Sequence, residues 1–327
     1  MKKNTIVILL TIIGLLLFNI AEARAACYQY VLTIGSIGSN EGNLYLPSEV
    51  ALDTDGYVYV ADTFNNRIQK FGMNGEFALK WGNNGGAPGF FNTPYGIAVS
   101  SRGDVYVADS NNHRIQRFNS EGVYQGMWGS YGTSGNYAFN NPLAVAVDSG
   151  GYVYVADTGN NRIMKYTATG VYSTQWGSPG SGNSQFNGPY GVAAGPDGTI
   201  YVADNANCRV QRFSATGEYL GQWGNPGSGP GEFNMPAGVA VDKQGYVYVA
   251  DVWNHRIQKF SAAGVFVDMW GSSGSGNDQF NYPSGVAVGS TGIVYVADNN
   301  NSRVQRFKTD DRDCDGIADD ADNCFKT

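Results

Sequence analysis

The sequence predicts an all-β protein, and more specifically a six-bladed β-propeller built from four-stranded antiparallel blades. The main observation is a segment of the form V-Y-V-A-D or I-Y-V-A-D, which recurs six times at a spacing of 47 or 48 residues. Each repeat also holds four short runs of β-branched and aromatic residues, separated by turn residues. Only 15% of the residues are charged and 45 are glycine, a composition that argues against helical bundles and against disorder.

The four expected strands of each repeat follow a fixed order, which the fifth repeat illustrates. Its runs read G-V-A-V-D, V-Y-V-A-D, R-I-Q-K-F and a last run that ends in W-G, with a turn at residues 243–245 between the first two. The first two runs are almost continuously apolar, so both faces of these strands must be covered. Four-stranded sheets stacked radially around an axis meet this demand, and a four-strand unit of this length is typical of propeller blades.

The two ends of the repeat array predict how the ring closes. The sixth repeat stops after its third strand, at Phe307 and Lys308. Residues 30–35 precede the first repeat and resemble the fourth-strand runs, such as residues 77–82. We therefore expect the N-terminal strand to complete the last blade, which would leave no long open sheet edge.

The repeat P-x-G-V-A-V-D-x-x-G-x-V-Y-V-A-D-x-x-N-x-R-I-Q-x-F closely resembles the NHL repeat over residues 28–308. The resemblance implies a six-bladed β-propeller. It does not choose a function, because NHL propellers serve as protein-binding and RNA-binding platforms, as extracellular sensor domains and, in one lineage, as a peptidyl-hydroxyglycine amidating lyase.

The N-terminal segment predicts export. Lys2 and Lys3 precede an apolar run over residues 5–20 and an Ala23-Arg24-Ala25 sequence, so residues 1–25 are interpreted as a signal peptide of bacterial style. An uncleaved membrane anchor is the alternative, although the run is shorter than the roughly 20 residues that span a bilayer. The mature chain would be secreted, periplasmic or at the cell surface, with no membrane span and with the propeller at residues 26–308.

Charge and cysteine content restrict the partners. Removal of residues 1–25 moves the formal net charge from −7 to −9, and an acidic chain repels phosphate backbones, so nucleic-acid binding is not expected. The four cysteines are too few to be the main framework of a body this large, and their pairing is left open. They are Cys27, Cys208, Cys314 and Cys324.

An aspartate and an arginine five residues later recur in every repeat. The pairs are Asp62 and Arg67, Asp109 and Arg114, Asp157 and Arg162, Asp204 and Arg209, Asp251 and Arg256, and Asp298 and Arg303. A catalytic group is needed once, so we interpret these pairs as scaffold that fixes the connection between the second and third strands through charge-assisted hydrogen bonds. The residues expected to pack between blades are Trp81, Trp128, Trp176, Trp223 and Trp270, with Ile34 in the sixth place.

Positions that differ between repeats are the candidates for ligand contact. The residue before each arginine varies, and the only two histidines of the chain, His113 and His255, occupy it in opposite blades. They are too far apart to share a metal ion. Trp253 and Phe64 occupy another variable position in the same connections. We expect these aromatic residues, with His255, on a ligand-binding face, where an exposed Trp suits a sugar ring or a peptide aromatic. The alternative is a Trp folded over its own loop.

Glu49 stands at the entrance to an innermost strand where the other repeats have Gly or Ala. With Tyr95 and Tyr190 it is expected to line the channel mouth, as part of the ligand face. Propeller lactonases gather a carboxylate and amides near their channel. A single Glu therefore leaves open a metal-dependent lyase or hydrolase, similar to the amidating lyase or to a lactonase, as the alternative function.

Residues 311–322, D-R-D-C-D-G-I-A-D-D-A-D, predict a calcium site. The expected ligands are Asp311, Asp313, Asp315, the carbonyl of Ile317, Asp319 and Asp322, at the spacing of a calcium loop with Asp in the last place. Clustered carboxylates need a hard dication to offset their repulsion. A solvated acidic tail is the alternative.

With Asn323 and Cys324, this loop resembles a thrombospondin type 3 repeat over about fourteen residues. That resemblance implies tandem calcium loops stiffened by disulfides, so residues 309–327 are expected to be a calcium-binding segment. We expect either that the chain is a fragment of a longer protein or that this tail is vestigial.

The combined expectation is a non-enzymatic scaffold. It would be a monomeric ring that presents variable loops to a protein or glycan ligand, with calcium as the only cofactor.

Overall fold

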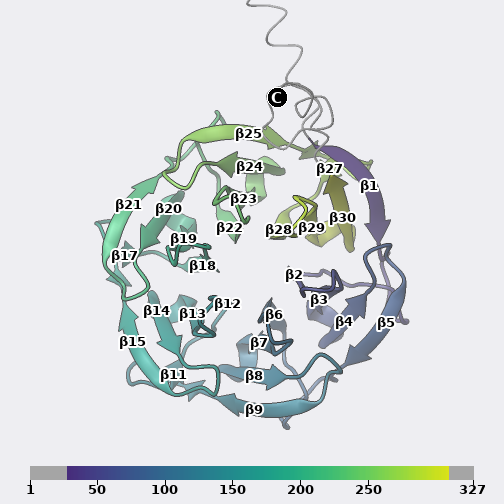
Figure 1. Ribbon diagram of the computed structural model, residues 1–327, viewed down its shortest axis with the longest axis horizontal. Helices are drawn as coiled ribbons and strands as arrows, with labels where there is room; N and C mark the ends of the chain where they lie inside the picture. Colours follow the sequence, from purple (N-terminus) through teal and green to yellow (C-terminus); the bar gives the residue numbers. More distant parts are fainter. Residues whose placement is uncertain (1–27, 309–327) are drawn as a thin grey trace, which may run out of the picture.

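The computed structural model describes residues 28–308, which form a ring of six four-stranded antiparallel sheets (Figure 1). The all-β, six-bladed prediction is confirmed. Blade 1 consists of β2 (Glu49–Leu52), β3 (Val58–Asp62), β4 (Arg67–Phe71) and β5 (Phe77–Trp81). Blade 2 consists of β6 (Pro94–Val99), β7 (Val105–Asp109), β8 (Arg114–Phe118) and β9 (Tyr124–Trp128). Blade 3 consists of β12 (Ala144–Val147), β13 (Val153–Asp157), β14 (Arg162–Tyr166) and β15 (Tyr172–Trp176).

The remaining three blades repeat this order from the axis outward. Blade 4 consists of β18 (Pro189–Ala194), β19 (Ile200–Asp204), β20 (Arg209–Phe213) and β21 (Tyr219–Trp223). Blade 5 consists of β22 (Pro236–Val241), β23 (Val247–Asp251), β24 (Arg256–Phe260) and β25 (Phe266–Trp270). Blade 6 consists of β28 (Pro283–Val288), β29 (Val294–Asp298), β30 (Arg303–Lys308) and β1 (Gln29–Ile34).

Blade 6 combines the first and the last strands of the described chain. β1 pairs antiparallel with β30, with Gln29 opposite Lys308 and Ile34 opposite Val304. A bulge between Tyr30 and Leu32 interrupts the register. Blade 6 therefore has the same number of strands as the other blades, although its outermost strand comes from the opposite end of the chain.

Burial decreases from the second strand outward. All five residues of β3 and of its counterparts in the other blades are buried, because each second strand has a neighbouring blade on both faces. The outermost strand β15, in contrast, alternates half-buried and exposed residues. The apolar runs of the sequence thus mark the strands that are covered on both sides.

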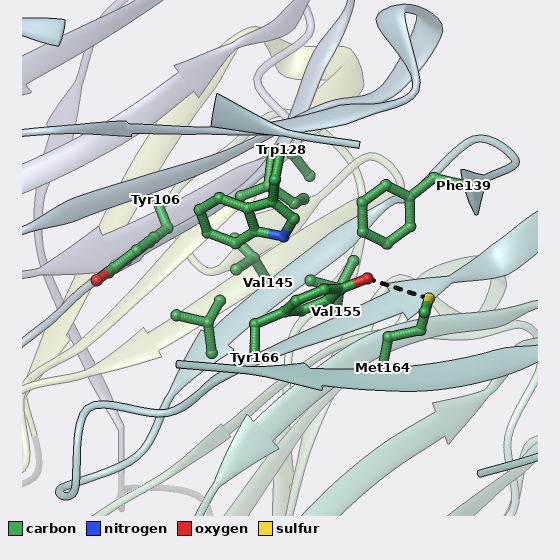
Figure 2. Packing of buried hydrophobic residues seen from close by; sticks show 10 residues of the cluster. Tyr106, Trp128, Phe139, Val145, Val155, Met164 and Tyr166 are labelled. Atoms are coloured by element: carbon green, nitrogen blue, oxygen red, sulfur yellow. Dashed lines mark hydrogen bonds between the residues drawn. The ribbon is translucent and has the colours of Figure 1, made fainter. Parts of the chain in front are cut away.

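The hydrophobic core lies between the blades and recurs around the ring. Figure 2 shows one such cluster, in which Trp128 of β9 packs on Tyr166 of β14 in the next blade, with ring centroids 5.6 Å apart. Gly170 must be glycine there, because a Cβ atom would lie 2.6 Å from the Trp128 ring. Where blade 6 lacks this turn, Tyr28 takes the place of the glycine and stacks on Trp270 at 3.7 Å.

The innermost strands lie around the axis of the ring (Figure 1). A Cβ atom on Gly191 of β18 would clash with the carbonyl oxygen of Ala237 on β22. Gly238 has the same relation to Ser284 in blade 6. This crowding explains why four of the six innermost strands carry glycine at this position.

The connections divide between the two faces of the ring. The second and third strands are joined by single 3₁₀ turns, which are η1 (Thr63–Asn65), η2 (Ser110–Asn112), η3 (Thr158–Asn160), η4 (Asn205–Asn207), η5 (Val252–Asn254) and η6 (Asn299–Asn301). The loops between blades lie on this same face, which we term the connection face. Three of these loops contain short parallel pairs, formed by β10 (Ser130–Tyr131) with β11 (Ala138–Phe139), β16 (Ser178–Pro179) with β17 (Gln185–Phe186), and β26 (Ser272–Ser273) with β27 (Gln279–Phe280).

Candidate binding face

Each second strand ends in an aspartate that joins three segments of the connection face. The Oδ2 atom of Asp251 accepts a hydrogen bond from Nε of Arg256 at 2.8 Å, and its Oδ1 atom accepts one from the backbone N–H of Asn234 at 2.7 Å. Asn254 and Gln258 donate to the same carboxylate. The carboxylate is fully buried and surrounded by donors, so it has no capacity left for a ligand.

The paired arginine holds the loop that enters the blade. Arg256 donates through Nη1 to the carbonyl oxygen of Ser228 at 2.6 Å and through Nη2 to those of Gly229 and Glu232. The ion pair recurs in all six blades at 2.7 to 2.8 Å. The twelve recurring residues therefore form the base of the face, and the groups available to a ligand must come from positions that vary.

The variable residue before each arginine adopts a left-handed backbone conformation, with φ between 51° and 54°. Asn tolerates this region better than most residues. In five blades the side chain also accepts a hydrogen bond from a backbone N–H of the next blade. These bonds join Asn66 to Thr93, His113 to Asn141, Asn161 to Gly188, His255 to Tyr282 and Ser302 to Leu46. In blade 4 the position holds Cys208, a half-buried free thiol.

The two variable aromatic residues are exposed to solvent. Trp253 on η5 and Phe64 on η1 each keep 55% of their surface accessible. Trp253 meets the edge of Tyr282 with a centroid distance of 5.6 Å, and Phe64 meets Tyr45 in a similar way at 5.7 Å. Each ring thus has one aromatic neighbour that fixes its orientation, and neither is folded into the core.

Trp253 forms part of a pocket of about 160 Å³ at the channel mouth. Tyr95 and Tyr190 also line this pocket, together with Met235 and Tyr282. The structure therefore brings together three of the residues that the sequence singled out. Phe64, His255 and Glu49 do not line it, although His255 contacts its wall through Tyr282 at a centroid distance of 4.8 Å.

Seven of the ten lining residues escape sequence reasoning, and the two largest of them are Met235 and Tyr282. They are the last residues of loops between blades, where positive φ angles of 56° and 55° are adopted by different residue types in different repeats. Because Leu46, Thr93, Asn141 and Gly188 occupy the equivalent places, the only available signal was that three of the six positions hold large apolar or aromatic side chains.

Tyr95 and Tyr190 meet across the channel. Their hydroxyl groups are hydrogen bonded to each other, and their rings are 5.5 Å apart in an edge-to-face arrangement. They come from β6 and β18, which belong to blades 2 and 4. Burial raises the pKa of both phenols, so both remain protonated at neutral pH. The two bonded hydroxyl groups thus form a polar part of the wall of the Trp253 pocket.

Glu49 is the first residue of the innermost strand β2 and is half-buried. Burial raises the pKa of its carboxyl group to about 8, although the backbone N–H groups of Val50 and Val286 counteract this effect. Val50 donates to Oε1 at 3.1 Å. The side chain packs over Gly285 of the neighbouring blade, where a Cβ atom would clash with Oε1. Glu49 is thus largely a neutral acid at pH 7, with no basic side chain bonded to it among residues 28–308.

The remaining predicted features have little structural description. The expected calcium ligands between Asp311 and Asp322 and the expected signal peptide lie outside the described residues, as do Cys27, Cys314 and Cys324. Between residues 28 and 308, no three His, Cys, Asp or Glu side chains are grouped closely enough to hold a metal ion. The same part of the chain contains no helix that is long and apolar enough to cross a membrane.

Comparison with known proteins identifies the repeat. The family model for the NHL repeat matches residues 44–71, 91–118, 139–166, 186–213, 233–260 and 280–307. E3 ubiquitin-protein ligase TRIM71 from Rattus norvegicus is 51% identical over 47 residues, which are 14% of this chain and only 6% of that protein. The sequence similarity to that relative thus extends over about one repeat.

Solved structures of low sequence identity share the fold. A gluconolactonase from Xanthomonas campestris is 12% identical, with a TM-score of 0.62, over 86% of this chain and 98% of its own. Virginiamycin B lyase from Staphylococcus aureus is 15% identical, with a TM-score of 0.59, over 86% of this chain and 99% of its own. At these identities the similarity concerns the propeller alone.

Proposed function

Because this chain belongs to the NHL repeat family, we propose that it is a non-enzymatic scaffold that binds a protein or glycan ligand on its connection face. The observation that supports this function is the exposure of Trp253 at the edge of a pocket with tyrosine walls. Exposed, oriented aromatic rings beside small pockets are typical of binding hot spots.

The pocket suits a ligand with both apolar and polar surface. Trp253, Tyr282 and Met235 offer apolar contact, while Asn205, Ser284 and Asn299 supply amide and hydroxyl groups. A sugar ring or a peptide aromatic has this combination of a flat apolar side and polar edges. The pocket volume of about 160 Å³ accommodates one such unit, so a larger ligand would extend over the surrounding loops.

The scaffold beneath the face favours recognition with little rearrangement. The buried Asp and Arg pairs hold every loop to its blade, and in five blades the variable residue bonds to the next blade. A preorganised face loses little entropy when it binds. We extend the proposal to a secreted or cell-surface location and to calcium binding by residues 309–327, on the sequence patterns given above.

The proposal is tested with a glycan and peptide array probed with the mature protein and with two variants. Trp253→Ala removes the aromatic wall of the pocket and should lower the signal for the bound ligand at least tenfold. Phe64→Ala is the matched control, because Phe64 is equally exposed in the equivalent connection of blade 1 but does not line the pocket. A ligand bound equally by all three proteins would remove Trp253 from the site.

A second candidate is a lyase or hydrolase that acts at the channel mouth. The observation that favours it is Glu49, whose pKa of about 8 makes it a neutral acid close to Tyr95 and Tyr190 at pH 7. Metal analysis of the Asp313→Ala/Asp315→Ala variant separates this candidate from the first. A stoichiometric metal that the Asp313→Ala/Asp315→Ala variant holds tightly, and that is lost when Glu49→Gln is introduced as a third substitution, would favour the enzyme. It would count against a pure binding scaffold.

A further inference from the structure

A second and larger pocket lies on the face opposite to Trp253. Its volume is about 430 Å³, and its walls come mainly from turns that join the first and second strands in blades 1, 2, 5 and 6, with Met73 added from the turn between β4 and β5. Leu52, Met73, Val288 and Ile293 give the pocket a mainly apolar lining. This volume is in the range of small-molecule sites.

Blade 6 lacks an aspartate that three of the other blades carry at this position. In blades 1, 3 and 5, the first strand is followed by an aspartate whose carboxylate accepts a hydrogen bond from a buried tyrosine of the second strand. The bonds are Tyr59 to Asp53 at 3.0 Å, Tyr154 to Asp148 at 2.9 Å and Tyr248 to Asp242 at 3.1 Å. Gly289 occupies the equivalent position in blade 6 and lines the pocket. The carboxylate is therefore absent at this position.

The tyrosine that would use this carboxylate remains. Tyr295 is buried and lines the pocket, and no group among residues 28–308 accepts a hydrogen bond from its hydroxyl. Blades 2 and 4 also lack the aspartate, but Tyr106 and Tyr201 donate to the carbonyl oxygens of Ala168 and Ala262. In blade 6, Nη1 of Arg306 donates to the equivalent carbonyl, that of Met73, at 2.9 Å, and Tyr295 forms no bond to this oxygen. The Tyr295 hydroxyl is thus left as an unused donor.

Arg306 supplies a positive charge next to this pocket, behind its Tyr295 and Met73 lining. Its guanidinium lies 5.9 Å from the centre of the Tyr295 ring and contacts the Met73 wall of the pocket. The equivalent Arg117 in blade 2 pairs with Asp104 at 2.8 Å, whereas Arg306 forms no ion pair with a described residue. Its Nε is buried without a hydrogen-bond partner in the described chain. A buried donor without an acceptor is costly, so an anion here would be favoured.

We propose that this pocket binds a small carboxylic acid with an apolar body. The ligand carboxylate replaces the missing aspartate side chain and accepts from Tyr295 and Arg306, while its chain contacts Leu52, Val288 and Ile293. Asp53 and Asp55 also line the pocket and would repel a carboxylate at their end, and Asp53 is already paired with Lys70 at 3.6 Å. The two acids disfavour a carboxylate at the blade 1 end, while Lys243 of blade 5 adds a positive charge to the lining.

The repeat itself supplies a variant that blocks the site. A Cβ atom on Gly289 would have only ordinary contacts, the nearest being Leu52 Cδ1 at 3.5 Å. Gly289→Asp should therefore fold, because it restores the residue that blades 1, 3 and 5 carry. Its carboxylate would satisfy Tyr295 internally and compete with a ligand. Arg306→Gln is the second variant, since it removes the charge and keeps a hydrogen-bonding side chain.

The test uses octanoate as the probe and 1-octanol as its uncharged match, with binding to the full chain measured by calorimetry at pH 7. Octanoate should bind the unchanged protein more tightly than octanol. Both Gly289→Asp and Arg306→Gln should weaken octanoate binding by about tenfold or more, since hydrogen bonds to charged groups carry this difference. Binding of octanol should change little.

Trp253→Ala separates this site from the proposed ligand face. It should leave octanoate binding unchanged, so loss of the connection-face ligand and loss of octanoate are independent results. Octanoate binding that survives Gly289→Asp would overturn the proposal, and so would the absence of octanoate binding at millimolar concentration.

Discussion

The Nδ1 atom of His255 accepts a hydrogen bond from the backbone N–H of Tyr282 at 3.2 Å, across the boundary between blades 5 and 6. His113 makes the same bond to Asn141 in the opposite half of the ring at 3.0 Å. In blades 1 and 3 the Oδ1 atom of an asparagine accepts the equivalent hydrogen bond. The histidines are therefore members of a series of links between blades, in which the shared property is an acceptor atom on a residue with positive φ.

This relationship predicts that asparagine can replace His255. His255→Asn should keep the free energy of unfolding within about 0.5 kcal/mol, because it retains the acceptor and the tolerance for positive φ. His255→Ala should lower it by about 1–2 kcal/mol through the unpaired N–H of Tyr282. Urea unfolding followed by tryptophan fluorescence measures both, and equal losses in the two variants would contradict the acceptor role.

The buried ion pairs predict that loss of a buried acid lowers the free energy of unfolding far more than loss of an exposed acid. Asp251→Asn leaves Arg256 without its counter-charge in a site where the aspartate is fully buried, and should cost about 3–5 kcal/mol of unfolding free energy. Glu218→Gln, which changes an exposed acid on a turn, should cost less than about 0.5 kcal/mol. Urea unfolding of both variants tests the difference. A small effect of Asp251→Asn would show that the pair contributes little.

Glu49 predicts a loss of stability with rising pH. The folded protein keeps the Glu49 proton up to a pKa of about 8, whereas the unfolded chain releases it near 4.5. The folded state therefore binds more protons between these values, and its stability from this group is full below pH 4.5 and falls as pH rises to 8. Melting temperatures of the unchanged protein and of Glu49→Gln, compared from pH 5.5 to 9, should differ with this slope. Parallel curves would contradict it.

The crowded innermost strands predict that alanine is not tolerated at Gly191. Its methyl group would meet the Ala237 carbonyl oxygen, which belongs to the backbone of the next blade and cannot move freely. Gly191→Ala should lower the free energy of unfolding by about 1–3 kcal/mol. Gly86→Ala is the control, because a Cβ atom at this exposed loop position meets only a side-chain oxygen at 3.9 Å. If both variants were equally stable, the close approach of the strands would be refuted.

The acidic sequence at residues 311–322 predicts that the chain binds calcium with a measurable heat. Calorimetry on the mature chain should show binding that disappears when Asp313 and Asp315 are both replaced by Ala. Replacement of Asp55 and Asp197, which are exposed acids on propeller turns, should leave the heat unchanged. An identical heat in the unchanged protein and the Asp313→Ala/Asp315→Ala variant would argue for a solvated tail.

The blades could be predicted from the sequence because their determinants are local and repeated. Every second strand carries the same apolar run, and each Trp recurs at a fixed distance from it, so the period alone indicates sheets covered on both faces. The recurrence of Asp251 and Arg256 in all repeats likewise separated scaffold from candidate site. These inferences needed no knowledge of how distant segments meet.

The candidate sites could be predicted only in part, because they depend on contacts between blades. Tyr95 and Tyr190 are 95 residues apart and meet only because the channel is narrow. The backbone N–H of Tyr282 donates to His255, and in other blades Asn or Ser supplies the acceptor in place of His. Because these residue types differ, their common role is not visible in the sequence. The pocket beside Tyr295 arises from an absent side chain at Gly289, and a missing carboxylate gives no signal until the neighbouring donors are seen in place.

The pairing of β1 with β30 determines the order in which the protein can fold during its synthesis. During synthesis β1 is among the first described segments to leave the ribosome, yet its partner, ending at Lys308, is the last. Until then the nascent chain carries an unmatched strand, and blades 1 to 5 must assemble as an open arc. The last step of folding is the pairing of β1 with β30, two strands that are far apart in the sequence. We expect this step to be slower than the folding of any single blade, because no local contact can replace it.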